Sequence, residues 1–200
     1  MTTRYLTCAE TAKLVRKSLK EAFPDAKFSV RGNTYSGGAS ITVGWTDGPN
    51  IKQVESVTCR FVASYFDGAI DYKGSIYHMM DGETVSFGAD HIHTRRAASD
   101  DAVERAIDKV YRNFRGNFLS AGIEKPTVED FRSGKLWNVC LPDVHVYGGE
   151  SVQGEITAAL GRSSDRLRGR VSKTAQRVFV THDDGYSRQC GSGFSAVSVH

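Results

Sequence analysis

A segment with helical periodicity precedes two segments with strand periodicity, and this order constrains the fold more than any other feature of the chain. Thr7 and Glu10 have the spacing of a capping box, and apolar residues recur at helical intervals until Pro24 stops the run. Alternating strands at 27–31 and 39–45 follow, joined by a glycine-containing turn. The order predicts an α+β fold in which a small antiparallel sheet packs against helices.

The same mixture of patterns continues through the N-terminal half. Asp47 is expected to cap a second helix with one apolar side, formed by Ile51, Val54, Val57 and Phe61. Two or three short strands with Asp-Gly and Lys-Gly turns follow between residues 66 and 96. A third helix should begin at Ser99 and end near Phe114. The expected order of this half is therefore α-β-β-α-β-β.

The weakest seam in the sequence lies between Gly116 and Pro126, where the periodic patterns fade. We therefore predict an α+β domain over 1–116 and a C-terminal α+β segment over 117–200. Whether the second segment packs on the first as one unit is left open. The C-terminal segment is expected to contain two short helices and a terminal hairpin, at 127–134, 151–160 and 177–200.

Three histidines, His78, His91 and His93, are the first candidates for catalysis. His91 and His93 would share one face of a strand, as two metal ligands do, because side chains alternate with period two. No third ligand follows at a familiar spacing, so ordinary strand histidines are the favoured interpretation. We predict no catalytic residue, no metal and no cofactor, and keep an enzyme that uses one of these histidines as an alternative.

Positive charge is concentrated in two places, although the formal net charge is only +3. Both sets are candidate partner-binding or nucleic-acid-binding residues: Lys13, Arg16, Lys17 and Lys20 on one face of the first helix, and Arg162, Arg166, Arg168, Arg170, Lys173 and Arg177 in the C-terminal run. Such clusters bind phosphate backbones and acidic proteins alike. A solvated helix face is the simpler interpretation of the first set.

No apolar run approaches the roughly 20 residues that a membrane span needs, and the first ten residues lack the apolar stretch of a signal peptide. A cytoplasmic protein without a membrane partner is therefore expected.

Four stretches of the N-terminal half resemble a known family, the large polyvalent protein-associated domain, family twenty-nine. They read YLTCAETAKLVRKSLKEAFPDAKFSVR, YSGGASITVGWTDGP, YFDGAIDYKG and VSFGADHIHTRR, and the resemblance covers about residues 4–97. Its most specific portions are 37–40, 45–49 and 66–68. The resemblance implies a biological setting rather than a catalytic activity. Such domains occur in phage and conjugative-plasmid proteins, often within long chains thought to protect incoming DNA. No catalytic residues are carried over from it.

The resemblance, together with the lack of catalytic motifs, favours a non-enzymatic binding protein that inhibits a host defence complex, as anti-CRISPR proteins do. The expected partner is that complex or its nucleic acid, in the cytoplasm of a bacterial host. A DNA-binding or RNA-binding accessory protein of plasmid transfer or maintenance is the alternative. A homodimer through an open edge strand is also left open.

Overall fold

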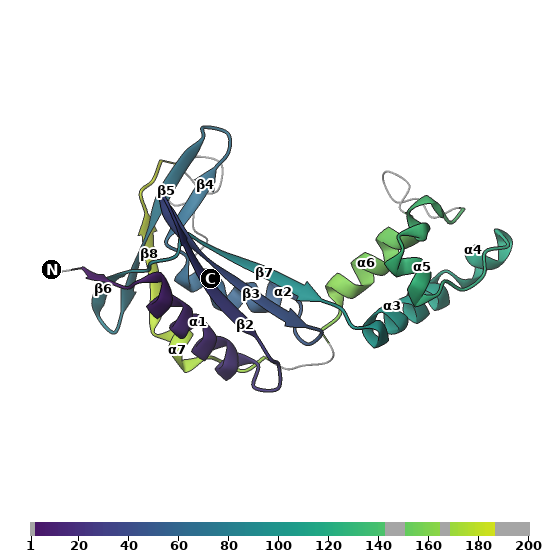
Figure 1. The fold of residues 1–200 in the computed structure, drawn as a ribbon, viewed down its shortest axis with the longest axis horizontal. Helices are drawn as coiled ribbons and strands as arrows, with labels where there is room; N and C mark the ends of the chain where they lie inside the picture. Colours follow the sequence, from purple (N-terminus) through teal and green to yellow (C-terminus); the bar gives the residue numbers. More distant parts are fainter. Residues whose placement is uncertain (1–2, 143–150, 165–168, 187–200) are drawn as a thin grey trace. The chain divides into compact units, whose positions relative to one another are not determined.

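The computed structural model describes residues 3–142, 151–164 and 169–186. These residues group into two compact units (Figure 1). The first unit takes the described residues of Met1–Trp45, Ile51–Arg96 and Leu167–His200, and the second takes those of Thr46–Asn50 and Ala97–Arg166. The predicted division into 1–116 and 117–200 stays a prediction, and the compact units have other bounds.

The first unit begins with helix α1 (Cys8–Ala22), which the sequence predicts correctly. The Thr7 hydroxyl accepts a hydrogen bond from the Glu10 N–H at 3.2 Å, and the Glu10 carboxylate accepts one from the Thr7 N–H at 2.8 Å. Two of the four unpaired donors at the start of the helix are thereby satisfied. Val15 and Leu19 are fully buried on the other face of the helix and anchor it to the core.

The predicted hairpin is present as strands β2 (Ser29–Tyr35) and β3 (Gly38–Thr46). Its turn is shorter than expected, because residues 32–35, which the sequence pattern assigns to the turn, pair with β3 as part of β2. Its two-residue turn holds Gly37 at φ 89°, a conformation that glycine adopts without steric cost. Strand β7 (His91–Ala97) adds to β3, so that the sheet has the order β2-β3-β7. Because it lies at the end of this order, β2 is an edge strand.

A five-stranded sheet completes the first unit. It consists of β1 (Arg4–Tyr5), β4 (Ser64–Asp67), β5 (Tyr72–Met80), β6 (Glu83–Ser86) and β8 (Val178–Asp183). The strands follow the order β1-β6-β5-β4, and β8 pairs with β5 in antiparallel orientation. Strand β8 is the first half of the predicted terminal hairpin, and 187–200 lie outside the described residues. About a hundred residues after β5, the chain thus returns to this sheet and adds β8 beside β5.

Short helices cover the remaining core of this unit: α2 (Ile51–Thr58), the 3-10 helix η1 (Cys59–Phe61) and α7 (Lys173–Gln176). Val54 and Phe61 are fully buried, as their spacing predicts, and Val57 packs partly against them. Ile51, in the first turn of α2, is 40% exposed. Helix α7 lies against α1 (Figure 1).

The second unit is built of helices: α3 (Asp100–Asn113), α4 (Arg115–Ser120), α5 (Val128–Arg132), the 3-10 helix η2 (Lys135–Asn138) and α6 (Val152–Arg162). Ser99 caps α3, and Thr127 and Asp130 form a capping box on α5, as the sequence predicts. The Asp47 carboxylate accepts a hydrogen bond from the Ser99 N–H at 2.9 Å. Ile107, Phe118 and Ile156 form a core separate from that of the first unit.

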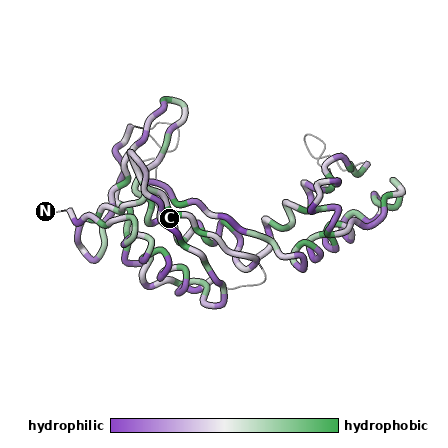
Figure 2. The backbone as a smooth tube through the Cα atoms, viewed as in Figure 1, coloured by the Kyte–Doolittle hydropathy of each residue, from purple (hydrophilic) through white to green (hydrophobic). Residues whose placement is uncertain are grey.

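The α+β fold class is thereby confirmed. Figure 2 shows hydrophilic residues interspersed with hydrophobic ones along the helices. Within the described ranges, none of the helices combines the length and the apolar character that a membrane span requires.

Candidate binding surface on the N-terminal helix

The three histidines occupy two different environments. His78 is fully buried on β5, with its ring edge-on to Phe87 at a centroid distance of 4.9 Å, and burial lowers its pKa to about 4. His91 and His93 share one face of β7, and their ring centroids are 6.1 Å apart. In the part of the chain that the structure describes, no three histidine, cysteine or acidic side chains are arranged to hold a metal. Catalysis by one of these histidines stays an alternative.

The C-terminal basic run is divided between the two units. Arg162 ends α6 in the second unit, whereas Arg170, Lys173 and Arg177 belong to the first. Arg166 and Arg168 lie outside the described residues.

Arg177 has a partner within the fold. Its Nε donates to Asp81 Oδ1 at 2.6 Å, and a terminal guanidinium nitrogen pairs with the other carboxylate oxygen. This bidentate geometry joins the start of β8 to the β5–β6 turn. A hydrogen bond from Arg177 holds the pKa of Asp81 below its usual value. The arginine is therefore engaged in holding the fold.

The basic residues of the first helix gather on one exposed face of α1. Lys13, Arg16, Lys17 and Lys20 follow the helical spacing i, i+3, i+4 and i+7, and all four are exposed. The two acidic residues of α1 are both held in hydrogen bonds to backbone N–H groups, Glu10 to Thr7 and Glu21 to Thr174. The lysines and Arg16 are thus the dominant charges of this face.

Part of the C-terminal run joins this face. The Arg170 N–H donates to the carbonyl of Ala22, the last residue of α1, at 2.8 Å. The Glu21 carboxylate accepts from the Ser172 hydroxyl at 2.8 Å and the Thr174 N–H at 2.9 Å, which seats the start of α7 on α1. Arg170 and Lys173 are both exposed beside the end of α1. We name the set Lys13, Arg16, Lys17, Lys20, Arg170 and Lys173 the α1 cationic surface.

Glu21 is ionised under ordinary conditions. Burial raises its pKa, but hydrogen bonds from the Thr174 backbone and from the Ser172 and Thr174 hydroxyls outweigh burial, so the pKa lies below its usual value. The ionised carboxylate stabilises the contact that places Arg170 and Lys173 near the C-terminal end of α1.

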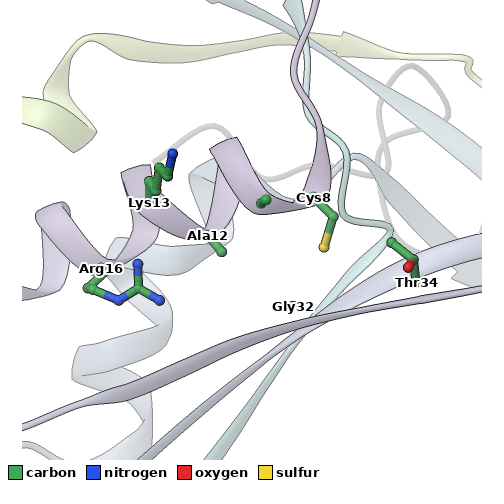
Figure 3. A pocket seen from close by; sticks show the side chains of 7 residues that line it. Cys8, Ala12, Lys13, Arg16, Gly32 and Thr34 are labelled. Atoms are coloured by element: carbon green, nitrogen blue, oxygen red, sulfur yellow. The ribbon is translucent and has the colours of Figure 1, made fainter.

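A groove of about 390 Å³ runs between α1 and β2, and we name it the α1–β2 groove. Its lining consists of Cys8, Ala9, Ala12, Lys13 and Arg16 on the helix and Gly32 and Thr34 on the strand. Figure 3 shows the side chains of Lys13 and Arg16 on the helix side and Thr34 on the strand side. The lining contains two cationic side chains and no carboxylate, so the groove attracts negative charge.

Two contacts determine how closely α1 approaches β2. The Arg16 guanidinium donates to the Val30 carbonyl at 2.8 Å. A Cβ atom at Gly32 would lie 2.9 Å from Cys8 Sγ, so any larger residue would displace the cysteine. Glycine inside a strand commonly marks such a close approach, and this was the sequence signal for the groove that our sequence reasoning missed. Cys8 and Thr34 gave no signal of their own.

Comparison with known families gives a match in the N-terminal half of the chain. Residues 6–99 match the family model described as large polyvalent protein associated domain 29. No curated protein and no solved structure matches the chain. The matched residues include α1, the α1–β2 groove and the four cationic residues of α1, whereas Arg170 and Lys173 come from the segment after the domain.

Proposed function

We propose that this protein, which carries the large polyvalent protein associated domain 29 in residues 6–99, is a non-enzymatic binding protein that inhibits a host defence complex. The domain associates the protein with mobile genetic elements, whose products meet such complexes in the bacterial cytoplasm. Inhibition would follow from occupation of a surface that the complex uses to contact protein or nucleic acid.

The observation that carries the proposal is the α1 cationic surface. Six exposed basic residues from the two ends of the chain lie along one helix and its C-terminal end. Complementary charge accelerates association and selects the partner, and an inhibitor requires only a rigid scaffold that presents such a surface. Arg16 and Arg170 add planar donors that suit carboxylates and phosphates.

Affinity capture from a bacterial lysate, with and without nuclease, tests the proposal. The bait is the intact protein, compared with the double variant Lys17→Glu, Lys20→Glu. The matched control is Lys52→Glu, Lys109→Glu, which makes the same charge change at exposed lysines of α2 and α3. We expect a defined protein complex that survives nuclease and is lost only with the first variant. Equal recovery by both variants would contradict the proposed surface.

A second candidate function is a nucleic-acid-binding accessory protein of plasmid transfer or maintenance. The same six cations favour it, because phosphate contacts by lysine and arginine need no base readout. Its signature is an affinity for DNA or RNA fragments that falls steeply as salt is raised, since each neutralised phosphate releases counterions. If only nuclease-sensitive material is captured and binding has this salt dependence, the second function replaces the first.

A further inference from the structure

Strand β2 presents unpaired backbone groups to the α1–β2 groove. The two-residue turn makes Tyr35 and Gly38 a hydrogen-bonded pair, and such pairs alternate along an antiparallel ladder. The pairs of Asn33 with Ser40 and of Arg31 with Thr42 are then hydrogen-bonded as well. The backbone groups of the intervening residues 30, 32 and 34 must point away from β3, toward the outer edge.

Two hydrogen bonds agree with this assignment. The Val30 carbonyl accepts from Arg16 rather than from β3. The Ala39 carbonyl, opposite Thr34, accepts from the Asp90 N–H on its other side. Within the described ranges no further strand pairs with β2 on its outer side. Gly32 and Thr34, both lining residues of the groove, therefore carry outward backbone groups that can pair with another strand.

We propose that the α1–β2 groove binds an extended acidic peptide segment of the partner protein as an added strand on β2. The proposal rests on the proposed function, because it specifies what the binding surface recognises. Main-chain hydrogen bonds to Gly32 and Thr34 supply part of the affinity in this mode of recognition, and side-chain contacts supply specificity. Lys13 and Arg16, on the opposite wall of the groove, select acidic side chains.

The other occupants of the edge fit less well. A second copy of this chain would bring its own α1 lysines against those of the first, which is unfavourable at short range. A nucleic acid lacks the alternating N–H and C=O groups that complete a β-ladder. An acidic peptide satisfies both the open edge and the cations.

The test uses the full-length protein and a fluorescein-labelled peptide of alternating glutamate and valine, about six residues long to match a typical strand. Fluorescence anisotropy measures its affinity. Thr34→Pro removes an outward N–H without touching the β2–β3 ladder, and the pyrrolidine ring blocks an incoming strand. We expect Thr34→Pro and Lys13→Glu each to weaken binding about tenfold or more, and Lys52→Glu, outside the groove, to leave it unchanged.

Modified ligands keep the test decisive if Thr34→Pro fails to fold. We expect the peptide with N-methyl groups on alternate residues, and the peptide with lysine in place of glutamate, to lose binding. Equal binding of the N-methylated and unmodified peptides would overturn strand addition. Dimerisation without peptide binding would assign the edge to a second copy. Binding of labelled single-stranded DNA without binding of the peptide would assign the groove to nucleic acid. Both outcomes would overturn the proposal.

The peptide test and the lysate capture fail independently. Peptide binding by the purified protein would stand even if no defence complex is captured. Capture of a complex that the Thr34→Pro variant still recovers would keep the proposed function and reject the groove as its contact.

Discussion

At the scale of single residues, His78 is the least ordinary member of the core. It lies on β5 with no exposed surface and packs against Phe87, in a position where the sequence pattern of β5 places an apolar side chain. Burial disfavours the imidazolium ion, which is why the pKa of His78 falls from 6.5 to about 4. The folded protein therefore holds this histidine neutral at every pH in the physiological range.

We predict that His78 makes the folded state sensitive to acid. In the window between pH 6.5 and pH 4 the unfolded chain binds a proton at this site that the folded chain rejects, so stability decreases as the pH falls. The loss reaches about 3 kcal/mol at the bottom of the window. Urea unfolding at pH 7.5 and pH 4.5 measures it.

The matched variants for this measurement are His78→Leu, which should reduce the difference in stability between the two pH values, and His93→Ala, which should leave it unchanged. His93 is exposed on β7, so its replacement removes a histidine without touching the core. An undiminished pH difference in His78→Leu would show that other groups cause the acid sensitivity.

At the scale of elements, three carboxylates fasten the C-terminal segment to the N-terminal half. Glu21 accepts a hydrogen bond from α7, and Asp81 pairs with Arg177. Asp184 accepts hydrogen bonds from the Tyr65 hydroxyl, the Tyr72 hydroxyl at 3.0 Å and the Ser75 N–H at 2.7 Å. Burial raises the pKa of Asp184, but these hydrogen bonds outweigh it and leave the pKa lowered. Asp184 thus anchors the end of β8 to the β4–β5 hairpin.

We predict that Glu21→Ala loosens α7 and β8 before it affects the rest of the fold. The substitution removes the acceptor for Ser172 and Thr174 and should cost about 1–2 kcal/mol. Hydrogen exchange of residues 172–183, followed by mass spectrometry, measures the effect. Asp25→Ala, which removes an exposed carboxylate beyond the end of α1, is the control. Unchanged protection of β8 in Glu21→Ala would refute the role of this contact.

Sequence reasoning was most successful for elements specified by local chemistry. Helix α1 has its capping box, α3 has Ser99 and an apolar stripe, and the β2–β3 hairpin has its Gly37 turn, so each is determined by neighbours in sequence. The pairing of β8 with β5 was beyond such reasoning, because it joins residues about a hundred positions apart and depends on tertiary packing. Helix α7 has only four residues and little periodicity to detect.

The candidate site likewise combines features that local sequence specifies with features that depend on tertiary packing. The cationic face of α1 follows from helical spacing alone, whereas the approach of Arg170 and Lys173 to it depends on the Glu21 contacts. The groove depends on the packing of α1 against Gly32. The glycine is a local signal of a close approach, but its partner, Cys8, is determined by tertiary packing.

Across the described chain, the matched domain is completed by residues that lie far beyond it in sequence. The core of the first unit includes Ala175 and Val178 beside the residues of the matched segment 6–99. The described residues between 97 and 164 form most of the second unit, with a core of their own. Because the segment after residue 168 packs on the first unit, Arg170 and Lys173 lie near the C-terminal end of the helix that carries the other four cations.

If the α1 cationic surface contacts the partner, a photo-reactive group placed on this surface should crosslink to that partner. A photo-reactive amino acid replaces Lys17 on this surface or, in the matched control, Lys109 on α3, and each protein is irradiated in host lysate. Our account predicts a discrete covalent adduct with the partner from position 17 and none from position 109. An adduct from position 109 with none from position 17 would contradict it.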